Sequence, residues 1–513
     1  MKNFNNDLRS VPFKNYDEYM EYVFFCINEC LDWYLSQMKI TFANNQGGYK
    51  NVIYPDLEVA HDICKVFVNR FNTRNENENV DKNDAGENVA GNEQEDFVDD
   101  ELLALLGNMF DVPQEEATKK ASEAPTSMTL EDKMEFIKER AKATIESGIK
   151  LPFYELCNKL EFSNFTVFCF ACGIISSTQT DYASVFQVVN ENANLSTPTI
   201  ESAAKLFYGD NYSITGAYAD MSVCLEQLLP ILDLRVVGSM PFSTSVSPDK
   251  RVIDFLFGRN PNKLDENYIR FFKMLTSNEE LDPIMANTQV LEAMEISYNE
   301  GVRIFAYFGD EGSGRKFFVK HFCEKNSLQA ITINCKKLFV YDFQFVEKAL
   351  WAVTRECIFL NACCCLEDLT YREEEKEKFF GYMDLAFSKL VDKGVMVFAL
   401  SKERIGLKDI TKEEYTELEL PTPINQEREE CWRYFSKKYA LDKDVELPEM
   451  ATKFLFTPGK IKSALHNARS LATMNKDILV SRAMLFQGCY NQMSSELTQK
   501  ATKVKANFGF GDI

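Results

Sequence analysis

The chain has 513 residues, of which 45% are hydrophobic, and this length allows about three domains of roughly 100–200 residues each. Its formal net charge of −21 argues against a general nucleic-acid binder and against a protein that binds anionic membranes. The polar N-terminus, the 15 cysteines and the lack of any apolar run near the roughly 20 residues of a membrane span predict a cytoplasmic protein.

The first part of the chain combines a helical unit with an acidic linker. Residues 1–73 are predicted to be helical, because apolar residues recur at helical spacing in Tyr16–Leu35 and again in Leu57–Phe71. Residues 74–127 are acidic and low in complexity, so we expect a disordered linker. Within it, Asp99–Phe110 has the amphipathic pattern of a helix that docks on a protein partner. A short helix resting on its own domain is the alternative.

Residues 128–250 are predicted to form a winged-helix-like domain, in which several helices precede a short β-ribbon. The expected helices are Thr129–Glu146, Leu151–Leu160, Asn164–Ile175, Tyr182–Asn192 and Ser196–Gly209. Strand-like runs at Leu232–Gly238 and Phe242–Val246 would supply the ribbon. The region is poor in lysine and arginine, so a DNA-reading role is disfavoured. Cys169 and Cys172 lie inside an apolar helix and are interpreted as core residues.

Strand-like and helical patterns alternate in the second half of the chain, which predicts a parallel α/β core at residues 301–423 after a helical connector at 251–300. The expected strands are Arg303–Phe308, Gln329–Asn334, Cys357–Ala362, Gly394–Leu400 and Tyr415–Leu420. The expected helices are Arg315–Lys325, Asp342–Thr354 and Glu373–Asp392. Residues 424–513 are helical in pattern and predict a lid.

The stretch Arg303–Lys316, RIFAYFGDEGSGRK, organises this core. An apolar strand, a glycine-rich turn and a helix follow one another, as in loops that hold phosphates with backbone N–H groups. The pattern G-x-x-x-x-G-K-[ST] is matched at Gly309 and Gly314. Arg315 stands where the lysine is expected, however, and Lys316 stands where the Mg²⁺-binding hydroxyl is expected.

At this point the chain resembles a bacterial group of AAA-family ATP-binding proteins with an N-terminal winged-helix domain. The resemblance covers roughly residues 150 to 513. It is carried by LSTPTIESAAKLF, LRVVGSMPF followed by RVIDFLFG, the phosphate loop, ELPTPINQEREECW and FTPGKIKSALHNA. It implies a multidomain α/β plus α fold: a P-loop AAA-type parallel sheet with a helical lid, preceded by helical and winged-helix-like domains. Some relatives are encoded beside contractile, phage-tail-like injection systems, and the family carries two ATPase modules. The final residues, KATKVKANFGFGDI, resemble the lead-in to the second module, which we expect to be absent from this chain.

The resemblance also implies which residues would contact ATP or ADP. A working AAA site uses a lysine on the phosphates, a hydroxyl on Mg²⁺ and a strand-end Asp and Glu for the metal and the attacking water. In CIFLNACCC, Asn361 takes the expected Asp position, while Glu367 and Asp368 are expected beyond the strand, in solvent. Ser401 and the lid residue Lys460 are candidates for further phosphate contacts. The candidate nucleotide-binding residues are Gly309, Gly312, Ser313, Gly314, Arg315, Lys316, Asn361, Ser401 and Lys460.

Most of the chemical positions depart from the AAA pattern, so no catalytic residue and no metal ligand is predicted, and a role for Mg²⁺ is left open. The leading interpretation is a degenerate, non-hydrolysing ATP-binding-type module that acts as the interaction or assembly part of a larger ATPase machine, as a homo-oligomer or ring. The alternative is an active AAA ATPase that remodels a protein partner and is linked to a contractile injection-type system. A third hypothesis, a winged helix that binds nucleic acid, is disfavoured by the acidic charge balance.

Overall fold

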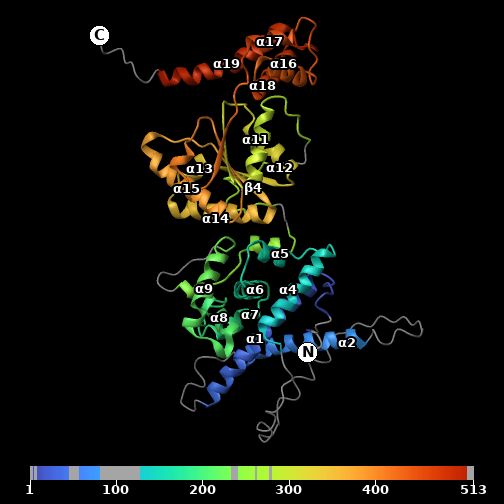
Figure 1. Ribbon diagram of the computed structural model, residues 1–513, viewed down its shortest axis with the longest axis vertical. Helices are drawn as coiled ribbons and strands as arrows, with labels where there is room; N and C mark the ends of the chain where they lie inside the picture. Colours follow the sequence, from blue (N-terminus) through green and yellow to red (C-terminus); the bar gives the residue numbers. More distant parts are fainter. Residues whose placement is uncertain are drawn as a thin grey trace, which may run out of the picture. The chain divides into compact units, whose positions relative to one another are not determined.

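The computed structural model describes residue 4 and residues 8–44, 57–80, 128–232, 241–259, 263–275 and 280–504. The chain divides into two compact units, Met1–Leu256 and Phe257–Ile513, and each is described by itself (Figure 1). The segment Asp99–Phe110 and most of the acidic linker lie outside the described residues, so their predicted roles stay predictions. The division of the chain into six segments also stays a prediction.

The first unit is built from helices. They are α1 (Tyr16–Asn44), α2 (Leu57–Val80), α4 (Leu130–Glu146), α5 (Pro152–Lys159), α6 (Asn164–Thr178), α7 (Tyr182–Val189), α8 (Ile200–Tyr208), α9 (Ile214–Leu228) and α10 (Lys250–Leu256), with short 3₁₀ turns at η3 (Gly209–Asn211) and η4 (Pro241–Ser243). Helix α6 is apolar on nearly every side and contacts α1, α7, α8 and α9, with α6 seen end-on in Figure 1. Because it has no polar face, it is buried at the centre of the unit. Its Cys169 and Cys172 are fully buried.

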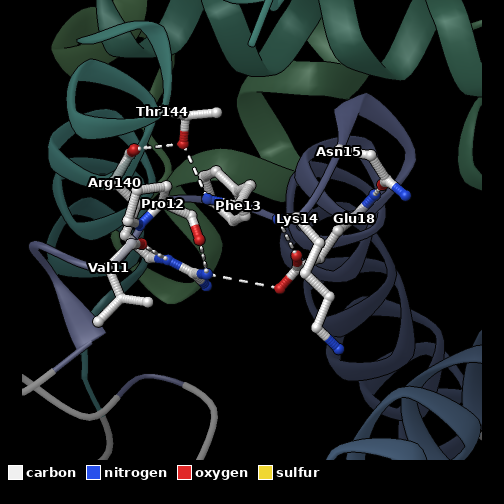
Figure 2. Close-up of polar contacts among 8 residues, drawn as sticks. All are labelled: Val11, Pro12, Phe13, Lys14, Asn15, Glu18, Arg140 and Thr144. Carbon is white, nitrogen blue, oxygen red and sulfur yellow. Dashed lines mark hydrogen bonds and ion pairs between the residues drawn. The ribbon is translucent and has the colours of Figure 1, made fainter. Parts of the chain in front are cut away.

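A buried arginine ties the N-terminal segment to α4 (Figure 2). The Nε of Arg140 donates to the carbonyl of Val11 at 2.9 Å, and one terminal nitrogen lies 3.4 Å from the Glu18 carboxylate. The guanidinium lies 3.9 Å from the centre of the Phe13 ring, a cation–π contact. One turn further along α4, Thr144 Oγ1 accepts the backbone N–H of Phe13 at 2.8 Å. The chain before α1 is thus held by side chains of a helix more than 100 residues away in sequence.

The β-ribbon expected at the end of residues 128–250 is not seen among the described residues. Residues 233–240, which hold most of the first strand-like run, lie outside them. The second run contributes η4 and one antiparallel bridge between Thr199 and Ser245. The winged-helix arrangement therefore stays a prediction.

The second unit contains a six-stranded sheet in the order β1-β3-β4-β5-β2-β6. Its strands are β1 (Phe272–Met274), β2 (Ile304–Phe308), β3 (Gln329–Asn334), β4 (Ala362–Glu367), β5 (Val397–Ser401) and β6 (Tyr415–Glu419). All neighbouring pairs are parallel except β1 with β3. The four inner strands are almost wholly buried and apolar, as expected for parallel strands that are covered on both faces.

Helices cover both faces of this sheet (Figure 1). They are α11 (Thr288–Asn299), α12 (Arg315–Lys325), α13 (Cys335–Leu338), α14 (Phe343–Leu360) and α15 (Lys376–Val391), with 3₁₀ turns at η5 (Glu373–Glu375) and η6 (Leu407–Asp409). Helices α11 and α12 share one core with side chains such as Phe305, Tyr307 and Phe398. Since side chains alternate along a strand, the other face carries the intervening residues, and α13, α14 and α15 contact the sheet there.

One predicted strand is misplaced, and one strand was not predicted. The strand expected at Cys357–Ala362 is instead the end of α14, which continues to Leu360 and closes on Asn361 in the left-handed conformation with φ 49°. The strand β4 begins only at Ala362 and runs to Glu367, so it lies five residues later than expected. The edge strand β1, within the predicted helical connector, was not predicted at all.

Four helices follow the sheet in the region predicted as a lid, and this name is kept for them: α16 (Asn425–Ser436), α17 (Leu447–Lys453), α18 (Pro458–Met474) and α19 (Arg482–Val504). They enclose a separate core around the fully buried Trp432. This layout of a mixed α/β sheet followed by helices agrees with the predicted α/β plus α class. Among the described residues, no helix combines the length and the apolar character that crossing a bilayer requires.

Candidate functional site

The carboxyl ends of three parallel strands meet at one edge of the sheet. Strand β5 lies between β2 and β4, and Phe308 at the end of β2 is paired with Ser401 at the end of β5. Strand β4 ends beside them at Glu367. Ligands of open α/β sheets bind at this edge, where the loops after the strands diverge.

The loop after β2 has a backbone that needs its glycines. Gly312 and Gly314 adopt left-handed conformations, with φ 78° and 98°, and Gly314 is the N-cap of α12. A Cβ on Gly309 would lie 2.5 Å from the carbonyl oxygen of Leu420, so only glycine fits there. The loop therefore leads straight into a helix N-terminus, whose free N–H groups and dipole favour an anion.

Ser313 carries the clearest sign of a missing ligand. The residue is only 3% exposed, and the described part of the chain provides no hydrogen-bond partner for its Oγ. A buried hydroxyl without a partner costs about 1–3 kcal/mol, and native proteins rarely keep one without a reason. A phosphate oxygen in the adjoining cavity would satisfy it.

That cavity has a volume of about 450 Å³, within the range of roughly 300–1,000 Å³ that is typical of cofactor sites. Its lining falls into a polar and an apolar part. The polar part is formed by the loop residues Gly312, Ser313 and Gly314 together with Asp282, Asn287, Arg315, Lys316, Glu367, Asp368 and Lys462. The apolar part is formed by Ile284, Met285, Ala286, Phe317, Phe318, Leu400, Cys431 and Phe435. The lining thus offers polar groups for an anion and apolar groups for a ring.

The lid touches the loop directly. The N–H of Gly459, at the start of α18, donates to the carbonyl of Gly312 at 2.9 Å. The hydroxyl of Thr457 donates to the carbonyl of Glu311 at 2.8 Å. A Cβ on Gly459 would lie 2.6 Å from the Cα of Gly312, so the two backbones are in contact. Any ligand that moves the loop must also act on the lid.

Arg315 folds back over the loop. Its guanidinium donates to the carbonyl oxygens of Gly309 and of Asp310, the latter at 3.3 Å. Burial lowers the pKa of Arg315, although the nearby carboxylates of Asp310 and Glu311 oppose the shift. A cation in the first turn of a helix also faces the positive end of the helix dipole, which is unfavourable unless an anion is added.

Glu367 and Asp368 line the cavity. Glu367 is the last residue of β4 and is partly buried, so its expected place beyond the strand in solvent is wrong, whereas Asp368 follows the strand and is exposed, as expected. Glu367 ends β4 and forms an ion pair with Lys316; its side chain is 14% exposed and that of Lys316 is 51% exposed. Asp368 is left-handed, with φ 57°, and its carboxylate accepts from Asn334 Nδ2 at 2.5 Å. The acidic pair therefore stands at the strand end where an AAA site carries its Asp and Glu.

Asn361 lies at the wrong end of the strand. It precedes β4, and six residues of extended chain, about 20 Å at 3.3 Å per residue, separate it from the carboxyl edge. Its predicted contact with nucleotide is therefore wrong. Ser401 does end β5 at the correct edge and is buried, but it is not part of the cavity lining. On the lid, the cavity is lined by Lys462, two residues after the predicted Lys460.

Residues 282–287, the segment before α11, also line the cavity, and no sequence pattern predicted them. Asp282 accepts from Tyr434 Oη at 3.1 Å and lies 3.3 Å from Lys462 and 3.5 Å from Lys438. Partial burial alone would raise the pKa of Asp282, but these hydrogen bonds and charges lower it. The segment and the lid are thus joined by hydrogen bonds and ion pairs of Asp282. No sequence motif marks this segment.

Cys431 is the one cysteine among the described residues that line the cavity. All 15 thiols are free, and Cys363, Cys364 and Cys365 are buried in β4. Burial raises the pKa of Cys364 far above its usual value, so it stays a neutral thiol. Within the described ranges, no cluster of three or more His, Cys, Asp and Glu residues is arranged to hold a metal ion.

Comparisons with known proteins add little to this geometry. No family model matches the chain, and no curated protein matches it. Among solved structures, one described as "Structural Basis for Katanin Self-Assembly" aligns with 44% of this chain and 89% of its own chain, at 12% sequence identity and a TM-score of 0.34. A similarity of this size assigns neither family nor function, so the interpretation rests on the geometry of the site.

Proposed function

We propose that Phe257–Ile513 is a nucleotide-binding module of the AAA type that binds ATP or ADP in the cavity beside the phosphate loop and does not hydrolyse it. The observation that carries this proposal is the buried hydroxyl of Ser313, which has no partner in the described chain and lies in a glycine loop at a helix N-terminus. Its work is to hold or release a partner or a neighbouring subunit of a larger ATPase machine.

The two halves of the cavity support a nucleotide rather than a small anion. The loop, the N-terminus of α12 and Arg315 favour a chain of phosphates. The apolar half, which includes Phe317 and Phe435, suits a heterocyclic base, because aromatic side chains bind flat rings by stacking and by burial of apolar area. A bare phosphate would leave that half without contacts.

The side chains around the phosphates argue against hydrolysis. Hydrolysis needs a hydroxyl ligand for Mg²⁺ and a carboxylate that is free to orient water. Lys316 stands at the hydroxyl position and neutralises Glu367. Asp368, the other carboxylate, accepts a hydrogen bond from Asn334. Removing one such catalytic contact typically lowers a rate by about 10²–10³, so we expect this module to act through binding.

The lid offers a route from nucleotide to partner. Because α18 rests on the loop through Gly459 and Gly312, binding and release of nucleotide change the energy of lid closure. We further propose that the chain assembles into a homo-oligomer or ring and docks on a partner through Asp99–Phe110. Residues 128–250 are proposed to form the winged-helix domain. Mass photometry with and without nucleotide tests the assembly step.

An active ATPase that remodels a protein partner is the second candidate. It is favoured by the presence of both Glu367 and Asp368 in the cavity lining, where an AAA enzyme carries its acidic pair. Mg²⁺-dependent release of phosphate from ATP that is abolished by Arg315→Ala would support this candidate over the first.

The test of binding is a thermal shift of the full chain with ADP and with ATP. A ligand at about 100 times its dissociation constant adds about 2.7 kcal/mol to the stability of the native state. We expect a shift for the wild type and for the control Lys320→Ala, and a much smaller one for Arg315→Ala. Lys320 lies on the same helix but does not line the cavity. No shift at millimolar nucleotide, with or without Mg²⁺, would overturn the proposed function.

A further inference from the structure

The first turn of α12 holds a lysine where a metal-dependent nucleotide site needs a hydroxyl. In the pattern G-x-x-x-x-G-K-[ST] the last residue supplies an oxygen to Mg²⁺, and a strand-end acid holds the ion from the other side. In this chain the last position is Lys316, and its Nζ pairs with Glu367, the residue that ends β4. The ammonium therefore lies against the carboxylate that the metal ion would need.

These residues do not fit Mg²⁺. The ion requires oxygen ligands in near-octahedral geometry, whereas an ammonium group offers no lone pair and repels a dication. Asp368, the remaining carboxylate, accepts a hydrogen bond from Asn334. Arg315 adds a second positive charge beside Lys316.

We infer that this site binds nucleoside polyphosphates in their metal-free form, with the ammonium of Lys316 in the electrostatic role of the divalent ion. The inference rests on the proposed function, since it concerns the same cavity. A lysine has three N–H donors, so Lys316 can keep its bond to Glu367 and donate to a phosphate oxygen as well. Its side chain is 51% exposed and lines the cavity, which leaves room for the phosphate.

The cavity lining carries three cations, Arg315, Lys316 and Lys462, beside the carboxylates Asp282, Glu367 and Asp368. Arg315 donates to backbone carbonyls, and Lys462 approaches from the lid. Lys462 is shared with Asp282, at 3.3 Å. A nucleotide without Mg²⁺ carries two more negative charges than its metal complex. Arg315 and Lys316 on α12 and Lys462 on the lid can neutralise these charges without a metal ion.

The experiment titrates a fluorescent ADP or ATP analogue into the full chain, in EDTA and again in millimolar Mg²⁺. For the wild type we expect binding in EDTA that is as tight as, or tighter than, binding in Mg²⁺. Lys316→Thr restores the hydroxyl and releases Glu367, so Mg²⁺ should then tighten binding by about tenfold. Lys320→Thr makes the same exchange one turn later, outside the cavity, and should behave as the wild type.

A second measurement replaces Mg²⁺ by Mn²⁺ and follows the ion by electron paramagnetic resonance in the presence of protein and nucleotide. We expect the wild-type protein to displace Mn²⁺ from its nucleotide complex and Lys316→Thr to retain it in the site. Binding of nucleotide by the wild type only when Mg²⁺ is present would overturn the inference and leave the proposed function standing. Absence of binding in both buffers would overturn the proposed function itself. If Lys316→Thr does not fold, the wild-type comparison still decides between these outcomes.

Discussion

The contact between Gly459 and Gly312 allows a sharp test of how the lid and the phosphate loop are coupled. In Gly459→Ala the new Cβ would lie 2.6 Å from the Cα of Gly312 and 3.0 Å from its carbonyl oxygen. Carbon atoms at van der Waals contact are about 3.5–4.0 Å apart, so one backbone must move by about 1 Å. No flexible side-chain end can absorb the overlap, because the atoms of Gly312 that it meets are all backbone atoms.

The magnitude follows from two contributions. Overpacking of this kind costs about 1–3 kcal/mol. A shift of about 1 Å also breaks the Gly459 N–H bond to Gly312, which contributes about 0.5–1.5 kcal/mol net. An alanine stabilises a helix by up to about 1 kcal/mol relative to glycine. The free energy of docking the lid on the loop should therefore become less favourable by about 2 kcal/mol. If nucleotide binds only the docked state, this loss predicts an affinity lower by up to about 30-fold.

The assay compares nucleotide affinity and thermal stability across three glycine variants. Gly381→Ala, on α15, places its Cβ in open space and should leave affinity unchanged. Gly488→Ala, on α19, meets the carbonyl of Ala464 at 2.5 Å, so it should destabilise the lid core without touching the loop. If Gly459→Ala binds nucleotide as tightly as the wild type and is equally stable, the contact between lid and loop is not the closed state that binds nucleotide.

Three other predictions concern single side chains. Ser313→Ala removes the buried hydroxyl that has no partner in the described chain. The ligand-free protein should therefore gain about 1 kcal/mol of stability, measured by urea denaturation, while nucleotide affinity should fall about tenfold, measured by calorimetric titration. Arg140→Ala should lower the free energy of unfolding by about 2–4 kcal/mol, because it deletes the buried cation that holds the N-terminal segment. The control Arg9→Ala, at a half-exposed ion pair, should lower it by at most about 1 kcal/mol, and urea titration measures both. Hydrogen bonds from Arg482, and to a smaller extent from a lysine on α17, lower the pKa of Glu449 from 4.5 to about 2. The carboxylate therefore contributes fully to the stability of the fold above pH 4.5, and this contribution is lost as the pH falls to about 2. Glu449→Gln should therefore destabilise the lid at pH 7 but not near pH 2, and equal destabilisation at both pH values would contradict this reasoning.

The phosphate loop and α12 could be predicted because their signals are local. Gly312 and Gly314 mark positive backbone angles, and α12 spans Arg315–Lys325, the bounds that were predicted. The cavity as a whole could not be predicted in this way. Segment 282–287 and the lid helix α16 reach it only through tertiary packing, and nothing in their sequence pattern marks a ligand.

The misplaced strand shows where the periodicity of the sequence no longer distinguishes a helix from a strand. The run Cys357–Ala362 is apolar except for Asn361, and a short apolar run fits a buried helix end as well as a buried strand. The deciding signal is Asn361, since an asparagine in the left-handed conformation commonly ends a helix. Interpreted as a C-cap, it would have started the strand at Ala362.

That shift of five residues changes the chemistry assigned to the site. With the strand at Cys357–Ala362, the acidic position falls on an amide, and the site loses its carboxylates. With β4 at Ala362–Glu367, the strand ends on Glu367, and a carboxylate faces the phosphate loop. The departure from an AAA site then lies in Lys316, because its ammonium neutralises an acid that is present. A single exchange, Lys316→Thr, tests this view more directly than any attempt to build a missing acid, since it should release Glu367 for a metal ion without altering β4.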